Sequence, residues 1–95
     1  MDAEKSEEFY KKLIKQLYDT SKWPSTYLYK FIVLSEKEKI EAINTIFDNT
    51  GAVIESKKSK NGKYTSLSIT VILQNPEAVV AKYKEVTQIE GVISL

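Results

Sequence analysis

Residues 52–73 read AVIESKKSKNGKYTSLSITVIL, and this stretch decides the fold. Two runs rich in β-branched residues flank the pair Asn61-Gly62, which favours a two-residue type I′ turn. The sequence therefore predicts a β-hairpin made of residues 52–59 and 64–73. Such a turn places Lys60 opposite Lys63, so the numbers of paired residues add up to 123 throughout the hairpin.

Alternation along the hairpin assigns each side chain to one face of the sheet. The mostly apolar face is predicted to lie against helices, and it carries Ala52, Ile54, Ser56, Lys58, Thr65, Leu67, Ile69 and Val71. The opposite face is called the open face, and it carries Val53, Glu55, Lys57, Ser59, Tyr64, Ser66, Ser68 and Thr70. Lys30, on a neighbouring strand, is expected to join the open face.

Helices and strands alternate on either side of the hairpin. Apolar spacing predicts helices over residues 5–18, after Ser35 and after Asn75, whereas residues 27–34 and 91–95 favour strands. Ser35 and Glu38 have the spacing of a capping box at the start of the second helix. Asn75 followed by proline is typical of a helix start.

The order of elements predicts an α+β protein with a ferredoxin-like βαββαβ sandwich. In this arrangement two helices cover one face of a four-stranded antiparallel sheet. An extra N-terminal helix precedes it. We therefore divide the chain into residues 1–24, an amphipathic helix with a Trp-Pro linker, and residues 25–95, the ferredoxin-like domain.

The N-terminal helix carries an apolar stripe of Phe9, Leu13 and Leu17, which is expected to dock on something. Docking within the same chain and docking on another molecule are both open, and we favour the first. One surface that could receive the helix is the apolar end of the open face, near Leu28, Ile32, Val53 and Ile72.

Three residue types are absent, and their absence excludes several classes of functional site. The 95 residues contain no cysteine, histidine or arginine, and the 14 basic residues are all lysines in a chain of net charge +1. The usual ligands of zinc, copper and haem are therefore missing, as is histidine acid–base chemistry. We expect no enzyme activity, no cofactor and no metal site.

Location in the cell is inferred from hydropathy. The apolar runs are too short to cross a bilayer, and the acidic start MDAEKSEE lacks the apolar core of a secretory signal. We expect a cytoplasmic protein that does not associate with membranes.

The candidate binding residues lie on the open face. They combine cations, hydroxyls and one ring, and are Lys30, Lys57, Lys63, Tyr64, Ser66 and Ser68. These groups could bind a partner or a polar or anionic ligand. The alternative interpretation is a solvated sheet face, with the lysines at 57, 58, 60 and 63 protecting the hairpin from pairing with other chains. RNA binding is not expected, because the third strand of the sheet offers serines after Tyr64 instead of stacking aromatics.

Three segments resemble the YbeD-like family of small bacterial proteins of unknown function. They are YLYKFIV at residues 27–33, SKNGKYTSLSIT at residues 59–70, and EGVISL at residues 90–95. The resemblance implies an ACT-like, ferredoxin-like fold and a regulatory or binding role. ACT domains that bind amino acids usually have a glycine after the first strand, whereas this chain has Leu34-Ser35-Glu36, so an ACT-type effector site is not expected there.

We therefore predict a non-enzymatic regulatory or protein-interaction domain. Its partner is expected to be another protein or a second copy of the chain. A sensor of a small polar metabolite on the open face is the alternative, and an RNA-binding module is the least favoured.

Overall fold

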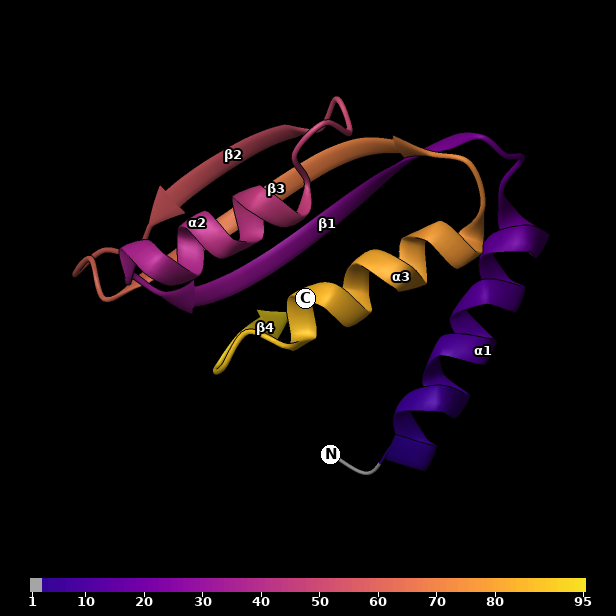
Figure 1. The fold of residues 1–95 in the computed structure, drawn as a ribbon, viewed down its shortest axis with the longest axis horizontal. Coiled ribbons are helices and arrows are strands. Elements are labelled where there is room, and N and C mark those ends of the chain that lie inside the picture. The colour runs from indigo at the N-terminus through magenta and orange to yellow at the C-terminus, as the bar shows by residue number, and fades with distance from the viewer. Residues whose placement is uncertain (1–2) are drawn as a thin grey trace.

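The computed structural model describes residues 3–95, with side chains from Glu7 onward (Figure 1). Seven elements follow one another along the chain: α1 (Ala3–Thr20), β1 (Ser25–Leu34), α2 (Lys37–Ile46), β2 (Val53–Lys58), β3 (Tyr64–Leu73), α3 (Pro76–Thr87) and β4 (Ile93–Ser94).

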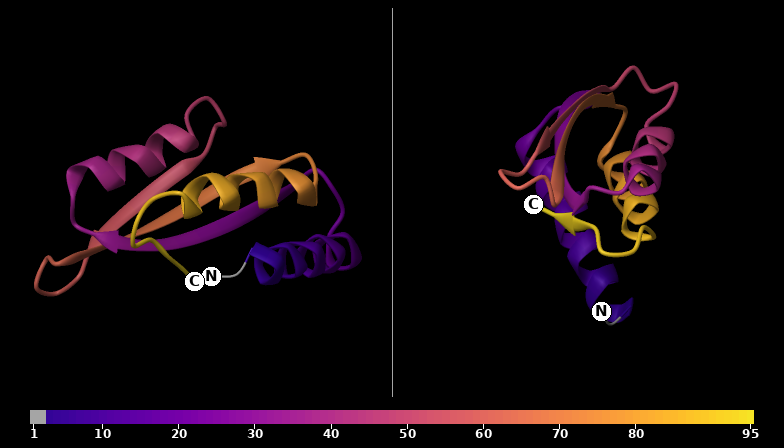
Figure 2. Two further views of the ribbon diagram at one scale, coloured as in Figure 1. Left: turned by 60° about the horizontal axis from the view of Figure 1, so that its bottom comes forward. Right: turned by 90° about the vertical axis from the view of Figure 1, so that its left-hand side faces the viewer.

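The four strands form one antiparallel sheet in the order β2-β3-β1-β4. Helices α2 and α3 lie side by side on one face of this sheet (Figure 2). The predicted α+β class and ferredoxin-like arrangement are therefore confirmed, with α1 as the extra N-terminal helix.

The predicted hairpin register is confirmed, but the predicted turn is wrong. Strand β2 pairs with β3 from Val53 opposite Thr70 to Lys58 opposite Thr65, and every pair adds up to 123. The tight turn instead has Lys60 and Asn61 at its centre, because the amide of Gly62 donates to the carbonyl of Ser59 at 2.8 Å. Only Gly62 in this turn has a positive φ, of 76°, whereas a type I′ turn requires two such residues.

The face assignment is also confirmed. Side chains of β3 that point toward the helices are buried, and they are Thr65, Leu67, Ile69, Val71 and Leu73. Tyr29 and Phe31 of β1 join them and are fully buried. The hydroxyl of Tyr29 donates to the carbonyl of Val79 at 2.8 Å, so this phenol enters the core without losing its hydrogen bond.

The predicted capping box at the start of α2 is wrong. Helix α2 begins at Lys37 with Glu36 as its N-cap, and no side chain caps it. The hydroxyl of Ser35 instead shares a 2.8 Å hydrogen bond with that of Thr65, the one buried polar residue on the covered face. Satisfying a buried hydroxyl takes precedence over a cap at a solvated helix start.

Helix α3 begins as predicted. The side chain of Asn75 accepts a hydrogen bond from the amide of Ala78 at 2.8 Å, and Pro76 occupies the first helical position.

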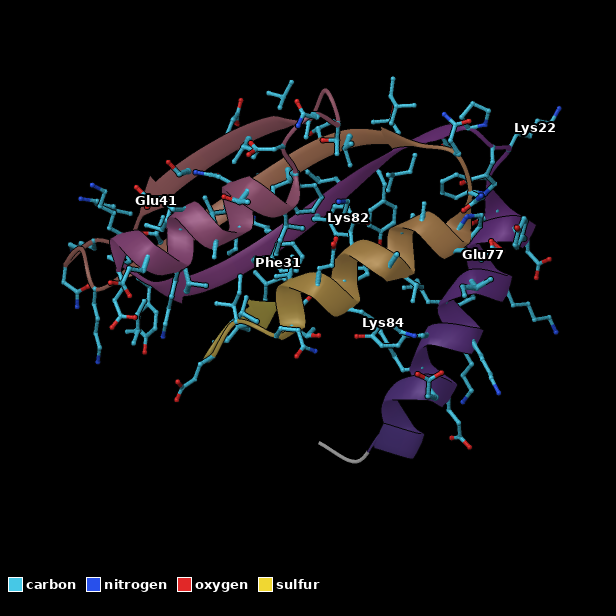
Figure 3. All side chains as sticks on the ribbon, viewed as in Figure 1. Lys22, Phe31, Glu41, Glu77, Lys82 and Lys84 are labelled. Atoms are coloured by element: carbon cyan, nitrogen blue, oxygen red, sulfur yellow. The ribbon has the colours of Figure 1, made fainter. Side chains whose placement is uncertain are left out.

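Helix α1 docks within its own chain, beside α3 and not on the open face. The hydroxyl of Tyr18 donates to the carboxylate of Glu77, and the ammonium of Lys84 lies 3.4 Å from the carboxylate of Glu7 (Figure 3). The linker after α1 is attached to the helix, because the indole of Trp23 donates a hydrogen bond to the carbonyl of Leu17 at 3.1 Å. The peptide bond from Trp23 to Pro24 is cis. The open face therefore stays uncovered by this helix.

Candidate functional site

The open face is built from rows of side chains that run across the sheet. Directly paired residues on antiparallel strands point to the same face, so the strand register defines each row. Three successive rows, read from β2 through β3 to β1, are Lys57–Ser66–Ile32, Glu55–Ser68–Lys30 and Val53–Thr70–Leu28. Five of the six predicted binding residues lie on this face, from Tyr64 at the hairpin end to Lys30 and Ser68 in the middle.

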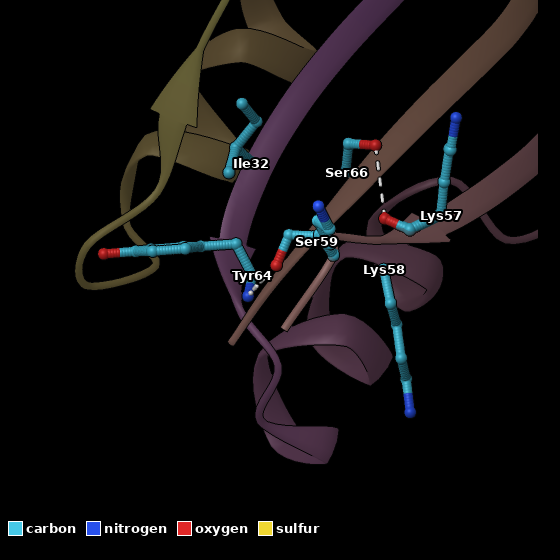
Figure 4. A pocket seen from close by; sticks show the side chains of 7 residues that line it. Ile32, Lys57, Lys58, Ser59, Tyr64 and Ser66 are labelled. Carbon is cyan, nitrogen blue, oxygen red and sulfur yellow. Dashed lines mark hydrogen bonds between the residues drawn. The ribbon is translucent and has the colours of Figure 1, made fainter. Parts of the chain in front are cut away.

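A hollow of about 430 Å³ opens at the hairpin end of the face (Figure 4). We call it the hairpin hollow, and it is lined by Ile32, Lys57, Lys58, Ser59, Lys60, Tyr64 and Ser66. The structure thus brings together Lys57, Tyr64 and Ser66 from the predicted set. Ile32, Lys58, Ser59 and Lys60 were not in that set, although the lysine-rich tip was visible in the sequence.

The other predicted residues lie outside this hollow. Lys30 and Ser68 are paired with each other, one row farther from the hairpin tip. The ammonium of Lys63 lies 5.5 Å from the centre of the Tyr64 ring, in a cation–π contact at the loop. The six residues therefore do not form one site.

Hydrogen bonds within the chain occupy both serines of the hairpin hollow. Ser66 donates to the carbonyl of Lys57 at 3.3 Å. Ser59 donates to the side chain of Asn61 at 3.1 Å and accepts from the amide of Tyr64 at 3.0 Å. What the hollow offers a ligand is consequently the lysines at 57 and 60, the ring of Tyr64 and the aliphatic Ile32. Lys58 pairs with Thr65, and its side chain extends in the opposite direction from that of Lys57 (Figure 4).

The lysines of the hollow form no ion pair with the described side chains. Among the residues whose side chains are described, no carboxylate lies within 4.0 Å of the ammonium of Lys57, Lys58 or Lys60. Exposed lysines without counter-ions attract anionic groups, with an energy that falls as salt is added. The hollow suits an anion bound beside an apolar surface.

Exposed apolar side chains gather on the open face. Leu28 is 60% exposed, Val53 62% and Ile72 65%, at the end far from the hairpin tip. Ile93 of β4 pairs with Ile32, which places both on this face, and Leu95 follows beside Lys30. Sequence reasoning missed these last two because a two-residue strand gives no register signal.

One row between these apolar groups is charged. Glu55 and Lys30 flank Ser68 on the two neighbouring strands. They are two strand spacings apart, about 9–10 Å, and within the described part of the chain neither forms an ion pair. We call Glu55–Ser68–Lys30 the polar row.

The arrangement gives no platform for stacking nucleobases. Tyr29 and Phe31 are buried beneath the helices, and the hydroxyl of the half-buried Tyr27 is bonded to that of Tyr83 at 2.9 Å. Of the aromatic residues on the strands, Tyr64 alone faces outward.

No cluster of three metal-binding side chains occurs in the region that the structure describes. Nor is any helix within residues 3–95 long and apolar enough to cross a membrane.

Residues 19–95 match the family model described as Protein of unknown function (DUF493). The chain belongs to this family. The DUF493 match starts at Asp19, so it includes the whole sheet with α2 and α3 and leaves out most of α1. Comparison with curated proteins gave no match, and neither did comparison with solved structures.

Proposed function

We propose that this DUF493 protein is a non-enzymatic protein-interaction domain whose open sheet face is its contact surface. One observation carries the proposal: of the eight large apolar side chains that are strongly exposed among the described residues, six lie on this face, namely Leu28, Val53, Tyr64, Ile72, Ile93 and Leu95.

Burial energetics explain why such a surface favours a partner. Covering a large aliphatic side chain contributes about 1.5–3 kcal/mol when burial is complete. Single exposed apolar residues are ordinary on protein surfaces, but contiguous patches mark interaction sites. Ile72 of β3 lies diagonally between Leu28 of β1 and Val53 of β2, and the three form such a patch.

The rest of the proposal follows from composition and resemblance. A chain without histidine, cysteine or arginine lacks the side chains that most catalytic sites use. We place it among the YbeD-like, ACT-related proteins of the bacterial cytoplasm, with regulation by contact as its role. Ser35 stands where the ACT glycine is usual, and its hydroxyl is engaged by Thr65, which argues against an effector site there.

Site-specific photo-crosslinking in living cells tests the proposal. A benzoylphenylalanine in place of Val53 should yield a covalent adduct with a protein that mass spectrometry identifies. The adduct should disappear when Ile72→Asp is added to the same face. The control is benzoylphenylalanine in place of Glu41, on α2 and exposed on the helical side. Absence of a protein adduct at Val53, or an equal adduct at Glu41, would refute the contact surface.

A second candidate function is supported by the lysines of the hairpin hollow, which form no ion pair with the described side chains. In this alternative the hollow binds a small polyanionic metabolite, and binding is sensed by the partner. Titration of the ¹⁵N-labelled protein with tripolyphosphate should then shift the amides of Lys57, Tyr64 and Ser66 in a saturable way. Shifts that rise linearly without saturation, or that are unchanged by Lys57→Gln, would rule the site out.

A further inference from the structure

The charges of the polar row are complementary to those of a second, reversed copy of the same row. From β2 to β1 the order of charges is minus, neutral, plus, carried by Glu55, Ser68 and Lys30. A second copy of the same row, laid on top in the opposite direction, would place each charge over its opposite. The flanking row Val53–Thr70–Leu28 has the same property in apolar terms, with an aliphatic residue at each end.

We propose that two copies of this chain pack open face to open face, related by a two-fold axis that runs along β3. This inference rests on the proposed function and names its partner as a second copy. The polar row sets the orientation of the two copies, and the apolar patch supplies the attraction.

The symmetry fixes which residues meet. Rotation about an axis along β3 keeps each row at its own level and exchanges the β2 side with the β1 side. Glu55 therefore faces Lys30 of the second copy, and Lys30 faces its Glu55. One row farther, Leu28 faces Val53 of the second copy and Val53 faces its Leu28, while Ile72 meets Ile72 near the axis.

Charge excludes a perpendicular in-plane axis at the level of the polar row. A two-fold axis perpendicular to the strands through Ser68 would place Lys30 over Lys30 and Glu55 over Glu55. Like charges facing each other across an interface cost several kcal/mol. Face-to-face sheets also keep their strands within about 30° of each other, which an axis along β3 satisfies.

The size of the face predicts a reversible dimer. The three strands β2, β3 and β1 overlap about this axis. At about 4.8 Å apart, with about 7–8 residues in contact at 3.4 Å each, they give on the order of 400 Å² per copy in projection. Stable specific interfaces bury about 800 Å² per partner. The dimer is therefore expected at the weak end of specific association, and it must be measured over a concentration series.

Repulsion between the lysine-rich hairpin tips opposes the dimer. The axis brings the lysine-rich hairpin tips of both copies to the same end. At a crossing angle of about 30° the tips, roughly 20 Å from Ser68, are displaced sideways by about 10 Å. This separation is close to one Debye length, about 8 Å at physiological salt, so the repulsion is largely screened there.

A charge-swap experiment on the full chain tests the proposal. In Lys30→Glu the polar row carries two carboxylates, and in Glu55→Lys it carries two ammonium groups. Each variant alone faces like charges in both symmetric pairs, but a one-to-one mixture restores both attractive pairs. Sedimentation velocity at physiological salt, from about 10 μM to about 1 mM, measures dimerisation of each variant and of the mixture.

We expect the unmodified chain to dimerise, each swap to raise its dissociation constant at least about 10-fold, and the mixture to return within about 3-fold of the original. Val53→Asp should abolish dimerisation, whereas Lys37→Glu on exposed α2 should leave it unchanged. Circular dichroism melting curves confirm that each variant folds. A monomer at all concentrations overturns the proposal, as does a mixture no tighter than its components.

The dimerisation experiment and the crosslinking experiment can fail independently, so the two proposals are distinguished. If crosslinking from Val53 captures a different protein and the chain stays monomeric, the contact surface stands and the second copy does not. If Val53 captures nothing, both proposals fail.

Discussion

The two faces of the sheet differ in composition and in exposure to solvent, although the same four strands form both. The covered face is mainly apolar along β1 and β3, where Thr65 is its one buried polar residue and α2 and α3 exclude water. Ser56 and Lys58, at its β2 edge, are exposed. The open face carries the polar row between the apolar patch of Leu28, Val53 and Ile72 and the lysine-lined hairpin hollow, and it remains exposed. A single strand therefore supplies core on one side and an available surface on the other.

This contrast shows that apolar content alone does not define a core. Ile69 and Ile72 are three positions apart on β3, yet Ile69 is fully buried and Ile72 is 65% exposed. Helix α1 could have covered Ile72 but packs beside α3, where Glu77 and Lys84 meet it. The open face is thus left exposed.

Truncating these two isoleucines should give the largest difference between the faces. Ile69→Ala removes fully buried volume and should lower the free energy of unfolding by about 2–5 kcal/mol. Ile72→Ala removes a side chain that is mostly in water and should cost under about 1 kcal/mol. Urea denaturation at a concentration where the chain is monomeric measures both. Equal midpoints would show that the face assignment is wrong.

The sequence predicted the faces because alternation along β3 is regular. The period of Thr65, Leu67, Ile69 and Val71 left one register that buries them together, and that register is observed. The exact turn was not predictable from Asn61-Gly62, because a glycine with positive φ also fits a turn centred one residue earlier.

The candidate site was predicted only in part. Lys57, Tyr64 and Ser66 line one hollow, and their common face follows from the hairpin register. The contributions of Ile93 and Leu95 depend on where the chain returns after α3, which is a tertiary relationship with no local pattern. The same applies to Ser35, whose partner Thr65 is distant in sequence.

Alkaline pH should destabilise the covered face through its tyrosines. Burial raises the pKa of Tyr29 and of Tyr83 above the ordinary value of 10.0, and the hydrogen bond with Tyr27 raises that of Tyr83 further. The folded protein therefore keeps these protons where the unfolded chain loses them. Their contribution to stability is complete below about pH 10 and is lost as pH rises through the raised values, by up to about 1.4 kcal/mol per pH unit for each group.

Urea unfolding from about pH 8 to about pH 11 tests this dependence. Tyr83→Phe is the matched variant, since it keeps the ring and removes one titrating hydroxyl. Its loss of stability above pH 10 should be shallower than that of the unmodified chain. Identical slopes would contradict a role for Tyr83.

The two ends of α1 also differ in burial, as the two faces of the sheet do. Leu17 is half-buried against the core, whereas Phe9 is 57% exposed. Leu17→Ala should therefore cost about 1–2 kcal/mol, and Phe9→Ala should change stability by less than about 0.5 kcal/mol despite removing the larger side chain. Thermal unfolding by circular dichroism compares them. A greater loss from Phe9→Ala would mean that α1 docks through its other end.

The last comparison concerns the hydroxyl pair of Ser35 and Thr65 on the covered face. Ser35→Ala leaves the buried hydroxyl of Thr65 without its partner and should cost about 1–2 kcal/mol. Adding Thr65→Val removes the orphaned hydroxyl at nearly constant shape, so the double variant should recover most of that loss. Glu38→Ala should cost under about 0.5 kcal/mol, because no capping box forms at α2. A double-mutant cycle in urea gives the coupling energy between Ser35 and Thr65 directly. Additive losses in this cycle would mean that Ser35 acts at the start of the helix and not on the sheet.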